Sequence, residues 1–544
     1  MANLSQQRRE KMLNFLETLK EQHKDDASLI AINQIEKELT SKKYGLVWEE
    51  HEEEVDVKMQ THIPVFTEVE DKEIVGDPDS EQYNFLLEGD NLHSLKLLEK
   101  THKGKIDVIY IDPPYNRGKN DFIYNDAYVG EDDTFRHSKW LSFMNRRLLL
   151  AKKLLADTGI ICISIDDNEF GQIKMLCDDI LGLENCINIF VWKRNSSGKT
   201  EKDKFTVNTE YVLLYSKTPK YQLNNVYKPL AESSQKMYNK DDNDGRGKYA
   251  TVSLQKPRDP GPETTFDYVD NTGKIWPCPQ KGWRMKYEKI KALENDGRLF
   301  MEGKSLRVKD YWNERENAGK RIDTLWDDLP ENSKASSDLD KLFGRKGVFD
   351  NPKPVDLVKR CVQIANKDAI VLDFFAGSGT TGQAVLDLNY EDGGNRKFIL
   401  CTNNENNICE DVTYQRLKTV ITGKRFDGSD YSEGRKANLK YYKTDFVDKE
   451  TEEIYDDLLE HTKEMIQLQY GVKVDNQRYI MIMDDEEMDE FEKHFNEYKN
   501  IEAIFINQDV LMTTSQEKML QDINTKIIPD CYFDFELREV GELW

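Results

Sequence analysis

Four consecutive residues, Asp112-Pro113-Pro114-Tyr115, have the types needed to hold a flat ring that carries an amino group. The Asp112 carboxylate accepts hydrogen bonds, the Pro113 carbonyl is a second acceptor on a rigid backbone, and Tyr115 offers an aromatic face. An adenine rotated out of a duplex needs two such acceptors for its amino group and a ring to stack on. The alternative is a proline-rich turn after a core strand, because four-residue motifs recur by chance.

A second candidate site is the glycine-rich turn within residues 369–381, AIVLDFFAGSGTT, where an apolar run ends at Asp373. Two glycines allow the backbone to approach a ligand closely, and a strand-to-helix turn of this kind suits a nucleoside cofactor. An ordinary tight turn between a strand and a helix is the alternative. The turn residues that we expect at the cofactor are Phe375, Ala376, Gly377, Ser378, Gly379 and Thr380.

A predicted strand must position the first motif. Residues 106–111 are mostly apolar and β-branched, as in a strand of a parallel sheet that is buried on both faces. Consecutive prolines cannot donate to a strand ladder, so this strand ends at Asp112. Open α/β sheets bind ligands at the carboxyl ends of their strands, which is where the motif lies.

Together, DPPY and FAGSGTT resemble the amino-methyltransferases of DNA, which use S-adenosylmethionine. The catalytic motif precedes the cofactor motif, an order that resembles the beta group, in which a target-recognition region lies between the two. The flanking stretches NFLLEGDNLHSLKLL and FILCTNNENN are similar to the modification subunit of type III restriction-modification systems. The resemblance extends from about Phe85 to Val447 and is weaker at both ends.

The resemblance implies an α/β fold: a Rossmann-like methyltransferase with a mixed sheet, helices on both faces and a permuted motif order. It also implies an inserted target-recognition domain. A small C-terminal α/β domain is expected from the restart of strand and helix patterns after residue 450. The predicted divisions are a helical segment (1–48), a catalytic half (49–219), a target-recognition domain (220–345), a cofactor half (346–445) and a C-terminal assembly domain (446–544).

Cofactor contacts outside the turn are carried over from the family. The family places an acid equivalent to Asp90 at the cofactor adenine, although Asp90 could simply cap the following helix. Lys353, which precedes Pro354, is expected near the methionine end. Many relatives place a glutamate at the end of the strand 397–402 for the ribose hydroxyls. Here that position holds Thr402, with Glu405 slightly later.

The implied reaction is transfer of the S-adenosylmethionine methyl group to N6 of a flipped adenine in duplex DNA. Positioning supplies most of the rate gain, because sulfonium is a good leaving group. Cytosine N4 methylation, RNA adenine methylation and a non-catalytic DNA-binding specificity subunit are the alternatives. The family also suggests a homodimer and an ATP-dependent restriction subunit as partner, although a solitary enzyme remains an alternative.

Net charge over the whole chain is −24, which by itself argues against DNA binding. Between Lys193 and Lys346, however, 31 Lys and Arg stand against 24 Asp and Glu, a net of +7. A basic segment in an acidic protein is a plausible DNA footprint. Trp276 and Trp283 are expected to pack rather than to bind. The expected DNA contacts are Arg246, Lys248, Lys256, Arg258, Lys281, Arg284 and Lys286.

Composition excludes several other classes of protein. A chain of 544 residues predicts two to four domains, and the absence of a long apolar run predicts a cytoplasmic protein without a membrane segment. Eight cysteines without a C-x-x-C pair, and no histidine cluster, predict reduced thiols and no metal site. Gly198-Lys199-Thr200 imitates a phosphate loop but lacks its first glycine, so we expect no nucleotide triphosphate site there.

Three further stretches carry structural expectations. Residues 1–40 repeat apolar side chains at helical spacing, which predicts two short helices. Residues 49–81 are acidic and are expected to form solvated connecting segments. The polar run from Asp166 to Glu169 is expected to cap the helix that follows it.

Overall fold

The computed structural model divides the chain into two compact units, one formed by Met1–Gln222 with Pro330–Trp544 and the other by Leu223–Leu329. The second unit falls within the segment 220–345, and residues 330–345 belong to the first unit. Across the described residues, no helix has the length and apolar character needed to cross a membrane. The residues that the structure describes are 4–40, 48–118, 121–124, 127–197, 205–228, 236–257, 261–302, 305–316, 320–528 and 532–540.

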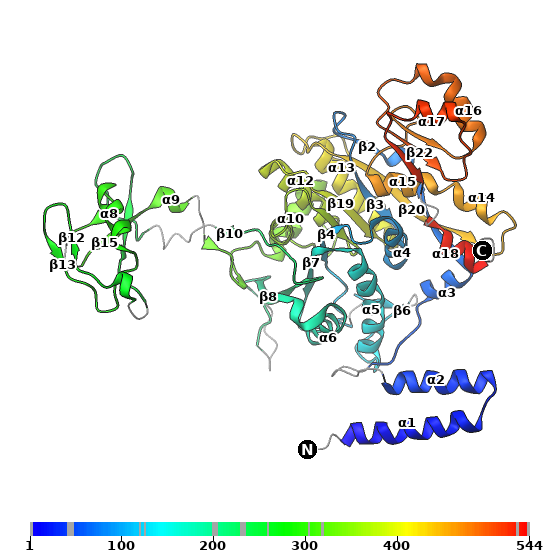
Figure 1. Ribbon diagram of the computed structural model, residues 1–544, viewed down its shortest axis with the longest axis horizontal. Coiled ribbons are helices and arrows are strands. Elements are labelled where there is room, and N and C mark those ends of the chain that lie inside the picture. The colour runs from blue at the N-terminus through cyan, green and yellow to red at the C-terminus, as the bar shows by residue number, and fades with distance from the viewer. Residues whose placement is uncertain are drawn as a thin grey trace. The chain divides into compact units, whose positions relative to one another are not determined.

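A mixed sheet forms the centre of the first unit (Figure 1). The order of its strands is β1 (His62–Glu68), β20 (Asn438–Asp448), β3 (Tyr83–Glu88), β19 (Lys397–Thr402), β18 (Ile370–Asp373), β4 (Ile106–Ile111), β7 (Leu155–Ile165), β9 (Thr209–Ser216) and β8 (Cys186–Lys193). The strands from β20 to β7 run parallel, while β1 is antiparallel to β20, β9 to β7 and β8 to β9.

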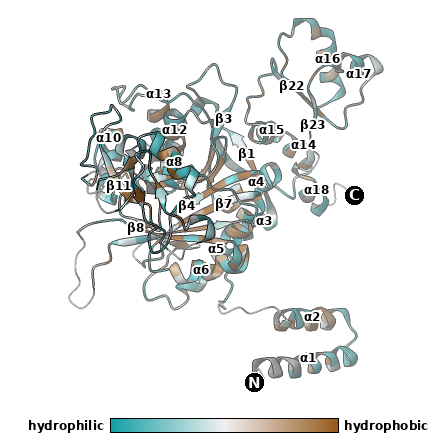
Figure 2. Cartoon of the chain, turned by 60° about the vertical axis from the view of Figure 1, so that its left-hand side comes forward, coloured by the Kyte–Doolittle hydropathy of each residue, from teal (hydrophilic) through white to brown (hydrophobic). Residues whose placement is uncertain are grey.

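Strand β4 is buried on both faces, as its sequence predicts. Ile109 and Ile111 belong to the same hydrophobic cluster as side chains of α4 (Asn91–His102) and α5 (Arg136–Leu154). Helix α11 (Val355–Gln363) also packs on β4, and its Cys361 lies near Tyr110, which alternates with those isoleucines along the strand. Helices therefore cover both faces, and apolar residues concentrate in the strands between them (Figure 2). The predicted α/β fold class is confirmed.

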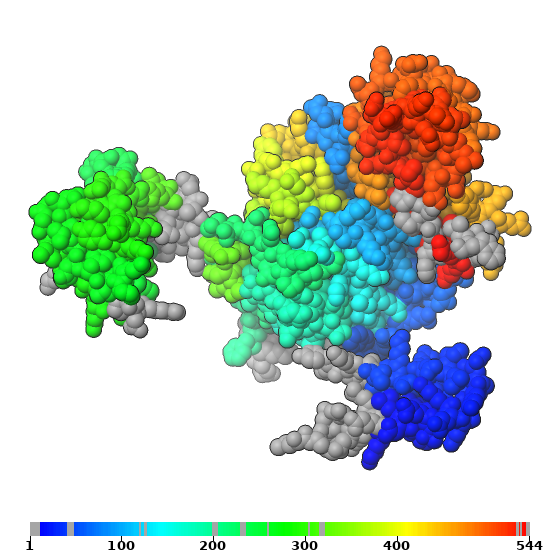
Figure 3. Space-filling view, in the orientation of Figure 1, coloured from blue at the N-terminus to red at the C-terminus, as the bar shows by residue number. Residues whose placement is uncertain are grey.

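The permuted order is visible in the strand pairing. Strand β18, which leads into the glycine-rich turn, pairs in parallel with β4, so that Val371 lies opposite Val108 and Leu372 opposite Ile109. The two halves of the fold are far apart in the sequence but pack together in space, as the neighbouring cyan and yellow surfaces in Figure 3 show.

The expectation for residues 49–81 is wrong. This stretch forms α3 (Glu54–Thr61), the edge strand β1 and the short β2 (Ile74–Val75), which pairs with β20. Ile63, Val65 and Phe66 are buried in the sheet. The many carboxylates nearby make the average composition of residues 49–81 acidic and hide the three apolar side chains. Burying these apolar side chains stabilises the strand.

The N-terminal helices and the alternation of strands and helices after residue 450 are as predicted. Helices α1 (Leu4–Gln22) and α2 (Asp26–Thr40) form the predicted N-terminal pair. After α14 (Ile454–Leu459) and α15 (Thr462–Tyr470), three parallel strands alternate with two helices. These elements are β21 (Tyr479–Ile482), α16 (Asp485–His494), β22 (Ala503–Asn507), α17 (Thr514–Met519) and β23 (Thr525–Ile528), and α18 (Asp534–Val540) follows them.

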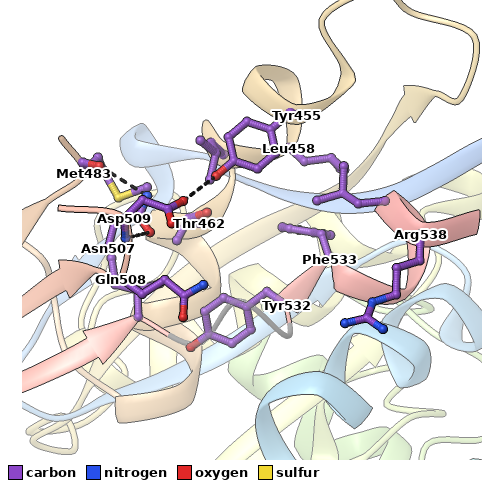
Figure 4. Close-up of a pocket in the computed structure, with 13 residues that line it drawn as sticks. Tyr455, Leu458, Thr462, Met483, Asn507, Gln508, Asp509, Tyr532, Phe533 and Arg538 are labelled. Atoms are coloured by element: carbon purple, nitrogen blue, oxygen red, sulfur yellow. Dashed lines mark hydrogen bonds between the residues drawn. The ribbon is translucent and has the colours of Figure 1, made fainter. Parts of the chain in front are cut away.

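A small cavity of about 180 Å³ lies at the carboxyl ends of these C-terminal strands (Figure 4). Apolar side chains line it together with Asn507, Asp509 and Arg538, and the Tyr455 hydroxyl donates a hydrogen bond to Asp509 over 3.3 Å. None of its lining residues belongs to either chemical motif. No residue of these C-terminal strands is among the described residues that line the two cavities of the site below.

The described part of the second unit consists of short strands and the helices α8 (Tyr287–Asn295) and α9 (Trp312–Glu316). An antiparallel sheet joins β11 (Tyr249–Ser253), β15 (Arg307–Tyr311) and β14 (Leu299–Phe300), and β12 (Tyr268–Val269) pairs with β13 (Ile275–Trp276). Trp276 and Trp283 are buried in its core together with Ile290 of α8 (Tyr287–Asn295). The prediction that both tryptophans pack is confirmed.

Replacing Trp283 with alanine is expected to unfold the second unit selectively. The ring is 2% exposed, and its Nε1 donates to the Phe266 carbonyl over 2.6 Å. Loss of a buried aromatic side chain costs about 3–5 kcal/mol, a large share of the stability of a small unit. Limited proteolysis should show cleavage within Leu223–Leu329 while the first unit stays intact. Tyr227→Ala, at a 52% exposed position of the same unit, is the control. Equal protection of Trp283→Ala and the control would contradict the prediction.

Candidate active site

The two motifs meet at one edge of the sheet because their strands are parallel neighbours. Residues 112–115 follow β4, and the turn 374–379 separates β18 from α12 (Thr380–Asp392). A cleft of about 780 Å³ is lined by Asp112, Pro113, Pro114, Tyr115, Arg117, Glu210, Lys353 and Glu405, among others. A second cavity of about 390 Å³ shares Asp112, Pro114 and Glu405 with it and is also lined by Asp90, Phe375, Gly377 and Thr402.

Asp112 lies where the two cavities adjoin. Its Oδ2 accepts a hydrogen bond from the Lys353 ammonium over 2.8 Å. Its Oδ1 is buried and has no hydrogen-bond partner among the described residues. Burial raises the pKa of Asp112, and the neighbouring Lys353 opposes that rise. The carboxylate therefore has one buried oxygen whose acceptor capacity is not used by the hydrogen bonds of the described residues.

The Tyr115 side chain is held in place from several directions. Its hydroxyl donates to Glu210 Oε2 over 3.2 Å, and its ring is buried with Arg117 and Lys353 each 4.8 Å from the ring centroid. Trp140 Nε1 donates to the Pro114 carbonyl over 2.7 Å, which fixes the proline backbone. The loop after β4 is thus braced by both its side chains and its main chain.

Asn116 completes this loop in the left-handed region, with φ of 55°. Its Nδ2 donates to Glu169 Oε1, which also lies 2.6 Å from His137 Nδ1. Burial raises the pKa of Glu169 to about 8. Asp166 accepts from Arg117 Nε over 2.7 Å. The expectation that these acids cap the next helix is wrong for Glu169, which sits at the N-cap of α6 (Phe170–Cys177) without a side-chain capping bond.

Glu210, at the start of β9, is the site residue that sequence reasoning missed. Its carboxylate lies 3.0 Å from Arg194 Nη1, 3.6 Å from Arg117 Nη2 and 3.6 Å from Lys353 Nζ. Burial raises the pKa of Glu210, but Lys353 and Arg194 outweigh burial and hold that pKa below its usual value. Because β9 is antiparallel to β7, its first residues lie at the edge where the parallel strands end. The sequence does show an acid at the start of an apolar strand. It does not show the direction of that strand in the sheet, which decides whether the acid reaches the site.

The glycine-rich turn has the backbone that its sequence requires. Gly377 and Gly379 have φ of 48° and 76°, and a Cβ on Gly379 would meet Thr413 Cγ2 at 3.1 Å. Asp373 accepts from the Phe375 amide and the Thr381 hydroxyl, and burial raises the pKa of Asp373 to about 7. Ala376 donates its amide to Cys401, while Ser378 and Thr380 accept from the buried Arg416 guanidinium.

Asp90 both caps a helix and faces the second cavity. Its Oδ1 accepts the Leu92 amide over 2.7 Å at the N-terminus of α4, and the buried Arg147 lies 3.3 Å from the same oxygen. Arg147 also donates to Glu53 over 2.9 Å. Thr402, the last residue of β19, and Glu405, three residues later, face the same cavity. Glu405 accepts from Asn403 Nδ2 over 2.7 Å. Asp90, Thr402 and Glu405 therefore lie around the second cavity, whereas Lys353, which the family places near the methionine end of the cofactor, lines the first cleft and not the second cavity.

The basic residues of the second unit differ in how available they are. Lys248, Lys281 and Arg284 are exposed. Arg246 is engaged by Asp244 and by the Asp296 carbonyl, Lys256 donates to Thr264 over 2.8 Å, and the exposed Lys286 pairs with Glu263 at 2.7 Å. Arg258 and Gly198-Lys199-Thr200 lie outside the described residues.

In the described part of the chain, no group of three or more His, Cys, Asp or Glu side chains could hold a metal ion.

The sequence profile of DNA methylases matches residues 106–415, which include both motifs and Glu210. The chain belongs to the DNA methylase family. The resemblance drawn from DPPY and FAGSGTT is thus confirmed, and this family membership accounts for the meeting of the two motifs at one cleft.

Relatives of this DNA methylase include the Type III restriction-modification enzyme StyLTI Mod subunit of Salmonella typhimurium (strain LT2), 34% identical over 371 residues, 62% of this chain and 56% of the relative. The Type II methyltransferase M.KpnI of Klebsiella pneumoniae is 33% identical over 383 residues, 66% of this chain and 90% of the relative. The Type III EcoPI Mod subunit of Escherichia phage P1 is 31% identical, covering 59% of this chain and 58% of the relative. The chain thus spans little more than half the length of these Mod subunits.

The buried Glu169 should make the stability of this methylase depend on pH. In an unfolded chain a glutamate has a pKa near 4.3, whereas here it is about 8, so folding takes up a proton between these values. Stability is greatest at the low end of this window and is lost as pH rises, by up to about 1.4 kcal/mol per pH unit.

Glu169→Gln keeps the shape of this side chain and removes its charge. Thermal unfolding should show little difference from the wild type near pH 5 and a growing advantage of the variant toward pH 8. Glu184→Gln, at an exposed position, is the control. A gap between Glu169→Gln and the wild type that stays constant from pH 5 to pH 8 would show that Glu169 is not protonated on folding.

Proposed function

We propose that this chain transfers the methyl group of S-adenosylmethionine to N6 of a flipped adenine in duplex DNA, as the modification and specificity subunit of a type III restriction-modification system. The observation that carries the proposal is the unpaired Oδ1 of Asp112, a residue that lines both of the cavities formed by the family's two motifs. One cavity has the features of a base site, and the other has those of a nucleoside site.

The side chains around the second cavity fit the cofactor. Asp90 and Glu405 provide carboxylates for amino and hydroxyl groups, and Phe375 provides a ring. The glycine-rich turn provides main chain that a ligand can approach closely. When bound there, S-adenosylmethionine would supply an electrophilic methyl group on a sulfonium.

On the base side, Asp112 Oδ1 and the Pro113 carbonyl would accept from the amino group, and Tyr115 would stack on the ring. These contacts draw the nitrogen lone pair out of conjugation and align it with the methyl carbon. The nitrogen would bond to the methyl carbon as the carbon–sulfur bond of the bound cofactor breaks, and the proton that the nitrogen loses would pass to the Asp112 carboxylate, which accepts its hydrogen bond. Positioning in a cleft of about 780 Å³ is the contribution of the protein.

The resemblance favours adenine, because related cytosine N4 enzymes tend to have serine where Asp112 stands. Cytosine N4 methylation and a non-catalytic DNA-binding subunit are the competing functions. The exposed Lys248, Lys281 and Arg284 are the best placed of the predicted DNA contacts. A homodimer, an ATP-dependent restriction partner and a cytoplasmic location complete the proposal. The similarity to M.KpnI along 90% of its length supports a solitary enzyme as the alternative assembly.

The test is single-molecule sequencing of DNA from cells that produce this chain, the Asp112→Ala variant or the control Asp157→Ala, which changes an exposed aspartate. We expect N6-methyladenine at one short sequence with the wild type and the control, and a loss of at least about 100-fold with Asp112→Ala, because the amino group then loses its charged acceptor. N4-methylcytosine would support the first alternative. Unmodified DNA, even after the restriction partner is added, would support a binding subunit.

A further inference from the structure

Two buried charges at the base side of the cleft, Lys353 and Glu210, have no part in the contacts proposed for the adenine itself. Lys353 stands between Pro352 and Pro354, immediately before α11, so its backbone is rigid. Its side chain is 7% exposed, and that of Glu210 is 3% exposed. Burying charges at this depth is costly unless each is paired, so their arrangement must be satisfied within the site.

Lys353 and Glu210 share their partners with the two side chains that would meet the base. Lys353 donates to Asp112 Oδ2 over 2.8 Å and lies 3.6 Å from Glu210 Oε2. The same Glu210 oxygen accepts from the Tyr115 hydroxyl over 3.2 Å. One ammonium and one carboxylate therefore connect the acceptor for the amino group with the ring for stacking.

We propose that Lys353 and Glu210 are positioning residues for methyl transfer. Lys353 occupies Oδ2 of Asp112, so that Oδ1 is the oxygen left for the target amino group. Glu210 holds the Lys353 ammonium and the Tyr115 hydroxyl at once, which sets the stacking ring relative to that oxygen. This inference rests on the proposed function, since it assigns roles in the same site.

Lys353 also has an electrostatic effect on the acceptor. Burial raises the pKa of Asp112, and Lys353 is the largest influence that opposes the rise. Asp112 and Glu210 in turn hold the pKa of Lys353 above its usual value despite burial. Without the ammonium, Asp112 would be protonated more easily, and a protonated carboxyl accepts less well from an amino group. The charged or titratable groups around Asp112 are Lys353, Glu210, Tyr115, Tyr110 and Asp373.

The first test measures single-turnover methyl transfer from pH 6 to pH 9 at saturating cofactor. The substrate is a duplex with the recognition sequence that the single-molecule sequencing experiment identifies. Lys353→Met should be at least ten-fold slower than the wild type at pH 7 and should recover as pH rises, because Asp112 then ionises. Lys220→Met, at a 73% exposed position, should match the wild type. Calorimetric measurement of cofactor affinity distinguishes a defect in cofactor binding from a defect in methyl transfer. An equal loss at every pH would overturn the role of Lys353.

The second test separates Glu210 from a general structural role. Glu210→Gln should lower the transfer rate about ten-fold or more with little change in KM for DNA, whereas Glu184→Gln should not. Tyr115→Phe combined with Glu210→Ala should be no slower than the slower single variant, because each change removes the hydrogen bond between Tyr115 and Glu210. Losses that multiply would overturn the role of Glu210. A wild-type chain that methylates no base would instead overturn the proposed function.

Discussion

Parallel pairing between β4 and β18 is the constraint on which the site depends. Val371 lies opposite Val108, and Leu372 opposite Ile109, so both strands end at the same edge. A parallel sheet places every carboxyl end on one side, and the side chains that follow those ends face a common space. A slip of one residue in this register would exchange the side chains between the two covered faces of the sheet, so the core that fixes the strands also fixes the distance between the motifs.

The sheet brings the two motifs together, and a network of paired charges then fixes the orientation of the side chains in the site. Asp112, Glu210 and Asp166 are matched by Lys353, Arg194 and Arg117, all at or near the end of a strand or the start of a helix. Such groups contribute little net stability, because desolvation offsets attraction. Their value is geometric: Lys353 holds Asp112, and Glu210 holds both Lys353 and the Tyr115 hydroxyl, so Asp112 and Tyr115 have few alternative orientations. Arg147 plays the same part at the second cavity, where it links Glu53 of the N-terminal segment to Asp90.

The sequence predicted the elements in which a run of neighbouring apolar residues indicates burial. Strands β4, β18 and β19 are continuous apolar runs, and the glycines of the turn after β18 require the conformation that the structure shows. Strand β1 was missed because its apolar side chains lie in an acidic stretch. The partners of Lys353 and Glu210 could not be predicted, because the Lys353–Asp112 contact joins residues 241 positions apart. Such a contact depends on strand order and direction, which local patterns do not encode.

The second unit is inserted in the chain between the two proposed positioning residues. Strand β9, which begins with Thr209 and Glu210, leads into the second unit at Leu223, and the chain returns to the first unit at Pro330, before Lys353. The two proposed positioning residues therefore lie on opposite sides of the insertion in sequence, yet 3.6 Å apart in space. The ends of an inserted unit must be anchored in the host fold if the insertion is not to disturb it. A buried ion pair that joins the outgoing and returning segments provides such an anchor, and the same pair aligns the residues that we propose hold the base.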